Sequence, residues 1–205
     1  MTTITPAAAV VLVRKNLDEL DPNGSVMYSG EDNTSLDDII KRMLPEAINM
    51  VHLAAPVQML EGKQGTISNP SVTDGVLSFS TNNFLRLVSF KASDSDIVIT
   101  DPIPEASPEG RKQLNPYIRG RYDRPRLVRL QAQDSFKYYS LKASTTAADA
   151  VSVFLVVEEQ TYNNEGDEIS YRRRQNIIDC LTAKVMETYN DQRAQSFYQK
   201  ANDFK

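Results

Sequence analysis

The chain has 205 residues, of which 40% are hydrophobic and 24% charged, and its formal net charge is −4. Such a composition is typical of a globular protein with a buried core and excludes disorder for the bulk of the chain. The single cysteine excludes an internal disulfide, and no apolar stretch approaches the roughly 18 residues that a membrane span needs.

The N-terminal segment predicts an amphipathic helix. Thr5 is a predicted N-cap, and Pro6 follows at the first helical position, where its missing N–H costs nothing. The predicted apolar face comprises Val10, Val13, Leu17 and Leu20. No basic residue precedes the short apolar run at residues 7–13, so a signal peptide is not expected. We expect a protein of the cytosol, or of a particle assembled in one.

A second helix is predicted from Ser35, where "SLDD" resembles a capping box, to Pro56. Its predicted apolar stripe comprises Leu36, Ile40, Met43, Ala47, Met50 and Ala54. Pro45 lies inside this stripe, and proline disfavours helical geometry at the residue before it. We therefore expect a kink or a break at Pro45, with Leu44 leaving the helix.

Residues 62–160 predict a β-rich insertion. Short segments rich in β-branched and aromatic residues alternate there with turn signals such as "NPS", "TDG" and "STNN". The run "VSVFLVV" at residues 151–157 predicts a strand that is buried on both faces. Between the strands, Ser107 and Pro108 predict a short capped helix that runs to Leu114.

The segment "RRRQNIIDCLTAKVMETYNDQRAQSFYQKA" at residues 172–201 predicts one long C-terminal helix. The expected fold is therefore α+β: a helical bundle from two N-terminal helices and the long C-terminal helix, with a large antiparallel β-rich insertion. Residues 1–61 and 161–205 are assigned to the bundle.

No catalytic motif, metal-ligand spacing or phosphate loop is present, and we expect neither an enzyme nor a cofactor. His52 is the only histidine and is interpreted as structural. Cys180 follows Asp179 in an apolar stretch and is interpreted as a core residue. A hydrolase whose carboxylates meet only in the folded chain stays open as an alternative.

A basic segment lies within the β-rich insertion. It comprises Arg111, Lys112, Arg119, Arg121, Arg124, Arg126 and Arg129. Such a segment can line a path for nucleic acid, bind carboxylates of another subunit, or remain solvated. The acidic balance of the whole chain argues against sequence-specific DNA binding.

Charge is also distributed unevenly along the chain. Residues 1–110 carry a balance of −8 and residues 111–205 a balance of +4. The two halves are either solvated faces of one domain or complementary surfaces of copies that meet head to tail. In the second case, salt weakens the assembly.

The segments "SLDDIIKRMLPEAINMVHLAA" and "RRRQNIIDCLTAKVMETYNDQRA" resemble the paired helices of ring-forming head–tail adaptor (connector) proteins of tailed bacteriophages. The resemblance covers residues 5–56 and 172–205. It implies a structural virion protein that forms a twelve-fold ring, attaches to the portal protein, extends the DNA channel and offers a docking surface to the next tail component.

In that family, C-terminal segments often bind the portal. The resemblance therefore implies a portal contact at Phe197, Tyr198, Ala201 and Phe204, with packing of this tail on the chain's own β-rich part as the alternative. A capsid- or tail-associated structural β-domain protein that does not form a ring is the alternative function.

Overall fold

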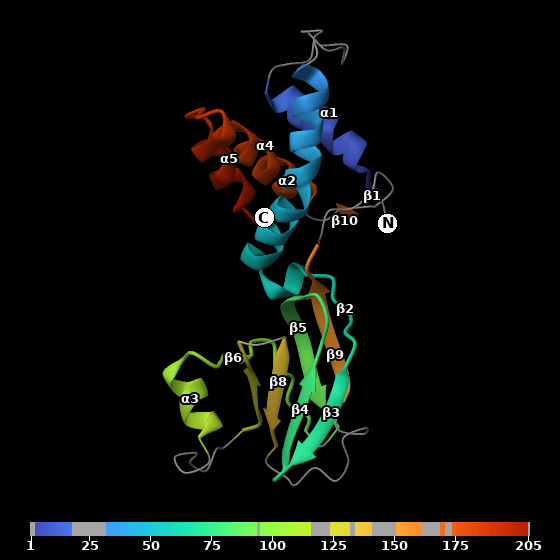
Figure 1. Cartoon of the computed structure of the whole chain (residues 1–205), viewed down its shortest axis with the longest axis vertical. Coiled ribbons are helices and arrows are strands. Elements are labelled where there is room, and N and C mark those ends of the chain that lie inside the picture. Colours follow the sequence, from blue (N-terminus) through green and yellow to red (C-terminus); the bar gives the residue numbers. More distant parts are fainter. Residues whose placement is uncertain are drawn as a thin grey trace. The chain divides into compact units, whose positions relative to one another are not determined.

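The computed structural model describes residues 3–17, 32–93, 95–115, 124–131, 134–140, 151–160, 169–170 and 174–204 (Figure 1). The chain divides into two compact units. Residues 1–59 and 160–205 form a helical unit, and residues 60–159 form a β unit that is inserted between them. The two segments of the helical unit are thus far apart in the sequence.

The helical unit contains α1 (Pro6–Asn16), α2 (Asp32–Ala54), α4 (Arg174–Thr188) and α5 (Ala194–Ala201). A short antiparallel pair, β1 (Thr3–Ile4) with β10 (Ile169–Ser170), joins the two segments of this unit, and a 3-10 turn at Val57–Met59 follows α2. As predicted, the Thr5 side chain caps α1 by accepting a hydrogen bond from the Ala8 N–H at 3.3 Å. None of the described helices is long and apolar enough to cross a membrane.

One apolar core holds the helices together. Its buried residues are Ala9, Val10, Val13, Leu36, Ile40, Leu44, Ala47, Ile48, Val51, Ile177, Ile178, Cys180, Leu181, Val185 and Ala201. On α2 the buried face thus includes Leu44, Ile48 and Val51, whereas the predicted stripe residues Met50 and Ala54 are exposed. The sequence offers apolar residues on two adjoining faces of this helix, and packing against α4 selects one of them.

Polar contacts between helices supplement the core. The buried Arg14 guanidinium of α1 pairs with Asp37 of α2 at 2.7 Å. The Asn16 amide donates to the Thr182 hydroxyl of α4 at 3.0 Å. These contacts hold α1 against α2 and α4. The pair with Asp37 is the stronger constraint, because a buried guanidinium without its carboxylate would be strongly unfavourable.

The expected break in the second helix is wrong. Helix α2 is continuous from Asp32 to Ala54, with Pro45 inside it and Leu44 in helical geometry. Leu44, Ala47 and Ile48 are all buried in the core. Burial of one leucine or isoleucine side chain contributes about 1.5–3 kcal/mol. The burial of Leu44 and Ile48 together therefore outweighs the cost of about 3 kcal/mol for a proline inside a helix.

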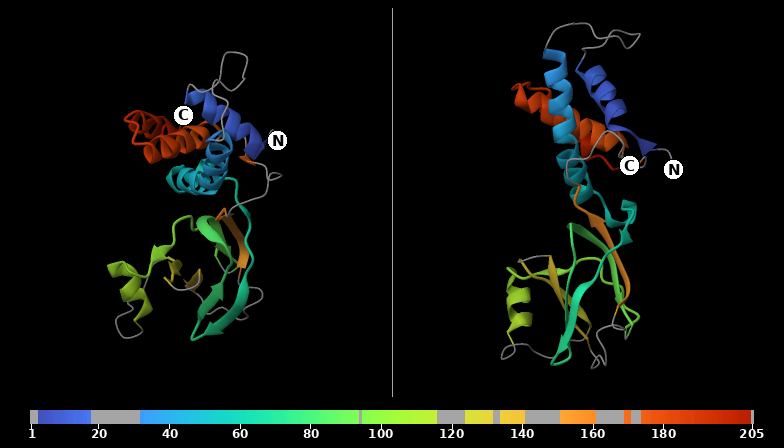
Figure 2. Two further views of the ribbon diagram at one scale, coloured as in Figure 1. Left: turned by 45° about the horizontal axis from the view of Figure 1, so that its top comes forward. Right: turned by 45° about the vertical axis from the view of Figure 1, so that its right-hand side comes forward.

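The predicted bundle of two N-terminal helices and one long C-terminal helix is also wrong. The C-terminal segment forms two helices, α4 and α5, which pack side by side in both views of Figure 2. The chain turns at Asn190, whose φ is 56°, and the Asp191 N–H donates to the Met186 carbonyl at 2.9 Å. Bidentate contacts between Arg193 and Asp191 complete the turn. The described part of the helical unit is therefore built from four helices.

The β unit contains two sheets. The smaller has the order β2 (Lys63–Gln64), β9 (Val151–Glu158), β5 (Phe84–Ala92). The larger has the order β3 (Ser68–Thr73), β4 (Val76–Ser80), β8 (Ser135–Tyr139), β7 (Arg126–Arg129), β6 (Ile103–Pro104). The pairs are antiparallel except for β6 and β7, which run parallel. Helix α3 (Pro108–Leu114) has the predicted Ser107 cap, with the hydroxyl accepting from the Gly110 N–H at 2.9 Å.

Aromatic side chains from both sheets form the core of the β unit. Phe79 of β4 stacks on Phe136 of β8 with 5.3 Å between ring centroids, and meets Phe154 of β9 edge-on at 5.4 Å. Rings of the two sheets thus interdigitate as in a β-sandwich. The prediction that strand β9 is buried on both faces is wrong, since Ser152 is exposed and Leu155 is only half-buried.

Candidate functional site

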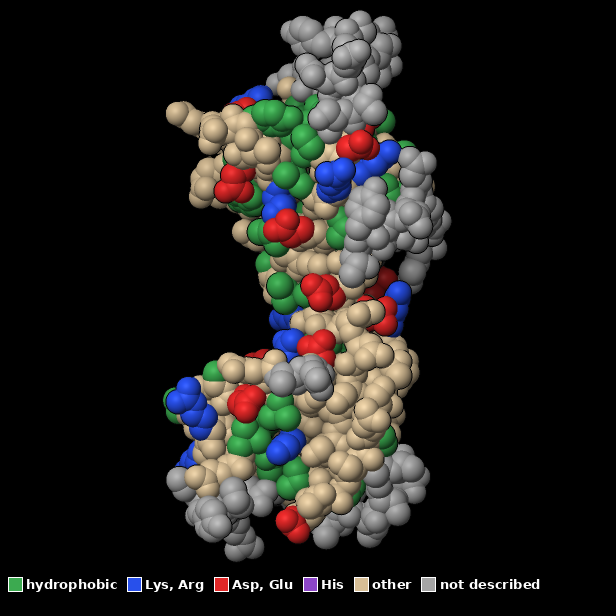
Figure 3. Space-filling view, in the orientation of Figure 1, with side chains coloured by type: hydrophobic (Ala, Val, Ile, Leu, Met, Phe, Trp, Pro, Cys, Tyr) green, Lys and Arg blue, Asp and Glu red, His purple; other side chains and the backbone are tan. Residues whose placement is uncertain are grey.

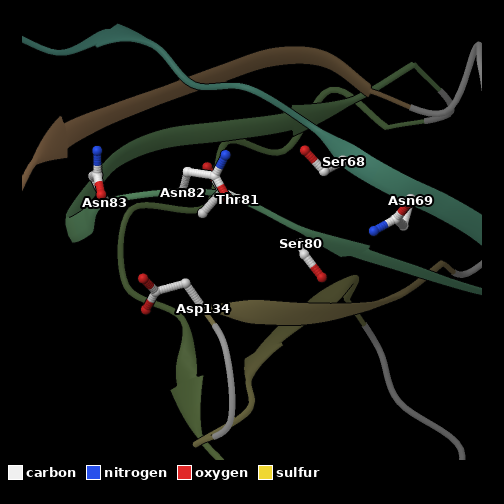
Figure 4. A pocket seen from close by; sticks show the side chains of 7 residues that line it. All are labelled: Ser68, Asn69, Ser80, Thr81, Asn82, Asn83 and Asp134. Atoms are coloured by element: carbon white, nitrogen blue, oxygen red, sulfur yellow. The ribbon is translucent and has the colours of Figure 1, made fainter.

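A polar pocket of about 580 Å³ lies in the β unit (Figure 4). Three separate segments line it: the start of β3, the end of β4 with the turn that follows, and the turn before β8. The lining residues are Ser68, Asn69, Ser80, Thr81, Asn82, Asn83 and Asp134. Every one of these side chains carries a hydroxyl, amide or carboxylate group, so the pocket presents hydrogen-bonding groups almost throughout.

Asp134 organises this pocket. Its carboxylate accepts a hydrogen bond from the Arg129 guanidinium at 3.1 Å and another from the Phe84 backbone N–H at 3.3 Å. Its backbone carbonyl accepts from the Thr81 N–H at 3.1 Å. Arg129 in turn lies over the Phe84 ring, 4.5 Å from the centroid. The negative charge of Asp134 is therefore offset by a guanidinium that is held in place by its own aromatic neighbour.

The backbone of the pocket is held in an uncommon geometry. Asn69, Asn83 and Asp134 have φ angles of 50°, 52° and 44°, in the left-handed region. Asparagine and aspartate tolerate this region better than other side chains do. Left-handed residues often gather at functional sites, so three of them around one pocket favour a binding role.

Thr81 is the most buried residue of the pocket, with 4% of its surface exposed. Its hydroxyl oxygen is buried and finds no hydrogen-bond partner within the described residues. An unsatisfied buried hydroxyl is unfavourable, and such groups are rare in folded proteins.

A second hollow, of about 400 Å³, lies in the helical unit and is mostly apolar. It is lined by Met50, Val51, Leu53 and Ala54 of α2, by Cys180 of α4, and by Tyr198, Ala201 and Asn202 at α5. Met50 is 40% exposed and Leu53 is 53% exposed. Apolar side chains on the surface of the helical unit are interspersed with charged residues of both signs (Figure 3).

The predicted basic segment does not form one basic surface. Arg126 forms an ion pair with Glu109, and Arg129 pairs with Asp134. Arg111, Lys112 and Arg124 are exposed, and within the described residues they form no ion pair. Arg119 and Arg121 lie outside the described residues. Two of the cations are thus engaged by carboxylates of their own unit, which reduces the charge left for a phosphate.

The four residues of the predicted portal contact lie in and just after α5. Ala201 is buried in the core, and Tyr198 and Phe204 pack against it. The Tyr198 hydroxyl donates to the Glu187 carboxylate at 2.7 Å, and burial together with this bond raises the Tyr198 pKa. Phe197 is half-buried, and the Lys200 ammonium lies 4.4 Å from the centroid of its ring. Three of these side chains therefore serve the chain's own core, and the portal contact stays a prediction.

Cys180 is buried, as predicted, and burial raises the pKa of its thiol to about 11. A thiol with that pKa is protonated at neutral pH and is a poor nucleophile. His52 is also buried. The described residues contain no group of three or more His, Cys, Asp or Glu side chains that could hold a metal ion.

The polar pocket was missed from the sequence. "STNN" lies at the end of β4 and in the turn after it, as its turn signal predicts, whereas "NPS" lies within β3, and nothing in their spacing joins either of them to Asp134. The pairing of β3, β4 and β8 brings these segments together. No known protein family and no curated protein matches this chain.

Proposed function

We propose that the chain is a structural virion protein, a head–tail connector that assembles with copies of itself into a ring between the portal and the tail. Such a ring extends the channel through which DNA passes, without reading its sequence. The protein acts in the virion after assembly in the cytoplasm of the host. The proposal begins from the resemblance of residues 5–56 and 172–205 to connector helices.

The observation that carries the proposal is the apolar hollow of the helical unit. Met50 and Leu53 are large apolar side chains at the edge of this hollow, and both expose about half of their surface. A cluster of exposed apolar side chains around a hollow is typical of a protein interaction surface. We assign the hollow to contacts with a neighbouring copy of the chain.

Polar groups around the hollow support the same assignment. Lys184 of α4 pairs with Glu46 of α2 at 2.7 Å, and its ammonium also lies 3.8 Å from the Met50 sulfur. An apolar centre with a charged rim is the usual anatomy of a protein–protein interface. Helices α2 and α4 pack on each other and thus present the hollow as one rigid surface.

Size-exclusion chromatography with light scattering tests the proposal. A ring of many copies has a mass many times that of the 23.0 kDa chain. We expect the native protein to form such a ring and Leu53→Asp to leave it a monomer, because a buried unpaired carboxylate strongly disfavours an interface. Val98→Asp is the matched control, because Val98 is equally exposed but belongs to the β unit.

The same mass measurement at low and at molar salt distinguishes two kinds of interface. An apolar contact survives molar salt, whereas a contact between complementary charges dissociates because salt screens the charges. A native protein that is a monomer or trimer under all conditions contradicts the ring and favours the alternative, a capsid- or tail-associated protein of another kind.

A further inference from the structure

We propose that the polar pocket of the β unit binds a neutral carbohydrate through the side chains of Asn69, Asn82, Asn83 and Thr81. This inference is independent of the ring, since every lining residue belongs to the β unit. The pocket's volume of about 580 Å³ falls within the range of about 300–1,000 Å³ that small-molecule sites occupy.

The lining side chains offer the hydrogen bonds that sugar hydroxyls need. Asn69, Asn82 and Asn83 are exposed, and within the described residues their amides make no hydrogen bond. Each amide presents two donors and one carbonyl acceptor in one plane. Because a sugar hydroxyl both donates and accepts, two neighbouring hydroxyls can be bound by one such amide.

The charges of the pocket exclude an anionic ligand. Among the described residues that line the pocket there is no lysine or arginine, and the one charged residue, Asp134, is negative. Arg129 offsets the Asp134 charge but is not itself among the described lining residues, so a phosphate or carboxylate would find no lining cation to pair with.

A metal cation fits poorly as well. Both oxygens of the Asp134 carboxylate already accept hydrogen bonds, one from Arg129 and one from the Phe84 N–H. Calcium sites use six to eight oxygen ligands and usually several carboxylates, and this pocket has one that is already engaged. A neutral polyhydroxyl ligand is the class that needs neither a free charge nor a metal.

The pocket is ordered before a ligand arrives. The left-handed residues Asn69, Asn83 and Asp134 fix the backbone on three sides, and the Asn83 carbonyl accepts a hydrogen bond from the Glu159 N–H at 2.7 Å. A backbone that is already ordered leaves only the side chains to lose entropy on binding, which favours affinity for a small polar ligand that competes with water.

Thr81 is the residue that a structural role explains least. Its buried hydroxyl is unfavourable in the free protein, and valine would fill the same space without that cost. Rotation about χ1 carries the hydroxyl toward another side of the Cβ, and a sugar hydroxyl bound there would satisfy it. A threonine at this position therefore fits a ligand-binding group better than a structural one.

Nuclear magnetic resonance of the full chain tests the proposal. The probes are glucose, galactose, mannose and N-acetylglucosamine, each titrated against the side-chain amide signals of Asn69, Asn82 and Asn83. We expect at least one sugar to shift these signals with saturation in the millimolar range, which corresponds to a binding free energy of about −4 kcal/mol. Thr81→Val should bind it at least about 10-fold more weakly while its thermal stability stays equal or rises.

Two further variants complete the design. Asn82→Ala removes an exposed amide and should weaken binding without affecting the fold, whereas Gln64→Ala, an exposed amide outside the pocket, should bind as the native protein does. The proposal is overturned if none of the sugars shifts the pocket amides, if calcium chloride alone shifts them, or if both Thr81→Val and Asn82→Ala bind with native affinity.

Discussion

Single residues set the chemistry of the polar pocket. Their backbone geometry could be predicted only in part from the sequence. Asparagine and aspartate in "NPS", "STNN" and at position 134 are residue types that favour turns. Three of them do adopt left-handed geometry, at Asn69, Asn83 and Asp134. Their convergence could not be predicted, because it depends on the pairing of strands that are more than fifty residues apart in the chain.

Asp179 in α4 gives a prediction of pH-dependent stability. Burial raises the pKa of this carboxyl above its ordinary value of 3.8, although the Gln175 amide and the Lys200 charge act in the opposite direction. An acid whose pKa is higher in the folded state makes the protein less stable above that pKa, and this cost disappears as the pH falls toward 3.8. We expect Asp179→Asn to be more stable than the native protein in urea unfolding at pH 7.

The difference between Asp179→Asn and the native protein should shrink as the pH falls toward 4, since a raised pKa makes the native carboxyl take up its proton at a higher pH than it does in the unfolded chain. Asparagine keeps an oxygen that can accept the Gln175 hydrogen bond of 3.0 Å. Asp203→Asn serves as the control, because this carboxyl is exposed. A stability difference that stays constant between pH 7 and pH 4 would refute the role of the buried charge.

At the scale of elements, the features that depend on only a few neighbouring residues could be predicted from the sequence. The caps at Thr5 and Ser107, each followed by proline, correctly locate the starts of α1 and α3. A cap acts through hydrogen bonds within one helical turn, so distant residues have little influence on it. The continuity of α2 through Pro45 was not predictable in this way, because burial against another helix decides it.

Pro45 leads to a prediction for α2. Proline has no N–H to donate to the carbonyl of residue 41, and alanine restores this donor. We expect Pro45→Ala to raise the free energy of unfolding by up to about 3 kcal/mol in urea denaturation. Pro56→Ala, after the end of the helix, should change it far less. A loss of stability in Pro45→Ala would mean that the proline ring itself contributes packing.

The sequence predicts one helix across the turn between α4 and α5, because helical intervals resume after the interruption at "NDQR". The residues that resume them are Ala194, Phe197, Ala201 and Phe204. The left-handed Asn190 and the Asp191–Arg193 contacts end α4 instead. The Asn176 amide, which donates to the Ala201 carbonyl at 2.8 Å, fixes the end of α5 near the start of α4.

The packing of α5 leads to a prediction for a C-terminal truncation. Deletion of residues 192–205 removes Ala201, Tyr198 and Phe204 from the core of the helical unit. We expect the loss of at least about 3 kcal/mol of stability and a clear fall in the melting temperature, measured by circular dichroism. Phe197→Ala, by contrast, should leave the melting temperature within a few degrees of native. A truncated protein with native stability would mean that α5 contributes little to the fold and is available for contact with a partner.

At the scale of the whole molecule, the net charge is distributed differently between the two compact units than between the two halves of the sequence. The β unit, residues 60–159, contains twelve acidic and twelve basic residues, so the net charge of −4 belongs to the helical unit. The contrast of −8 and +4 between sequence halves therefore combines parts of both units. Composition along the chain could not reveal this, because residues 160–205 fold with residues 1–59.

The discontinuous helical unit imposes an order on folding during synthesis. Helices α1 and α2 leave the ribosome first, yet six of the fifteen buried residues of their shared core lie on α4 and α5. The β unit has all of its strands between residues 60 and 159 and can fold while α1 and α2 still wait for their partners. At about 5–20 residues per second, residues 160–205 take roughly 2–9 s to be translated. During that interval the faces of α1 and α2 that later pack on α4 and α5 are exposed in the nascent chain, and we expect a chaperone that binds apolar segments to associate with it then.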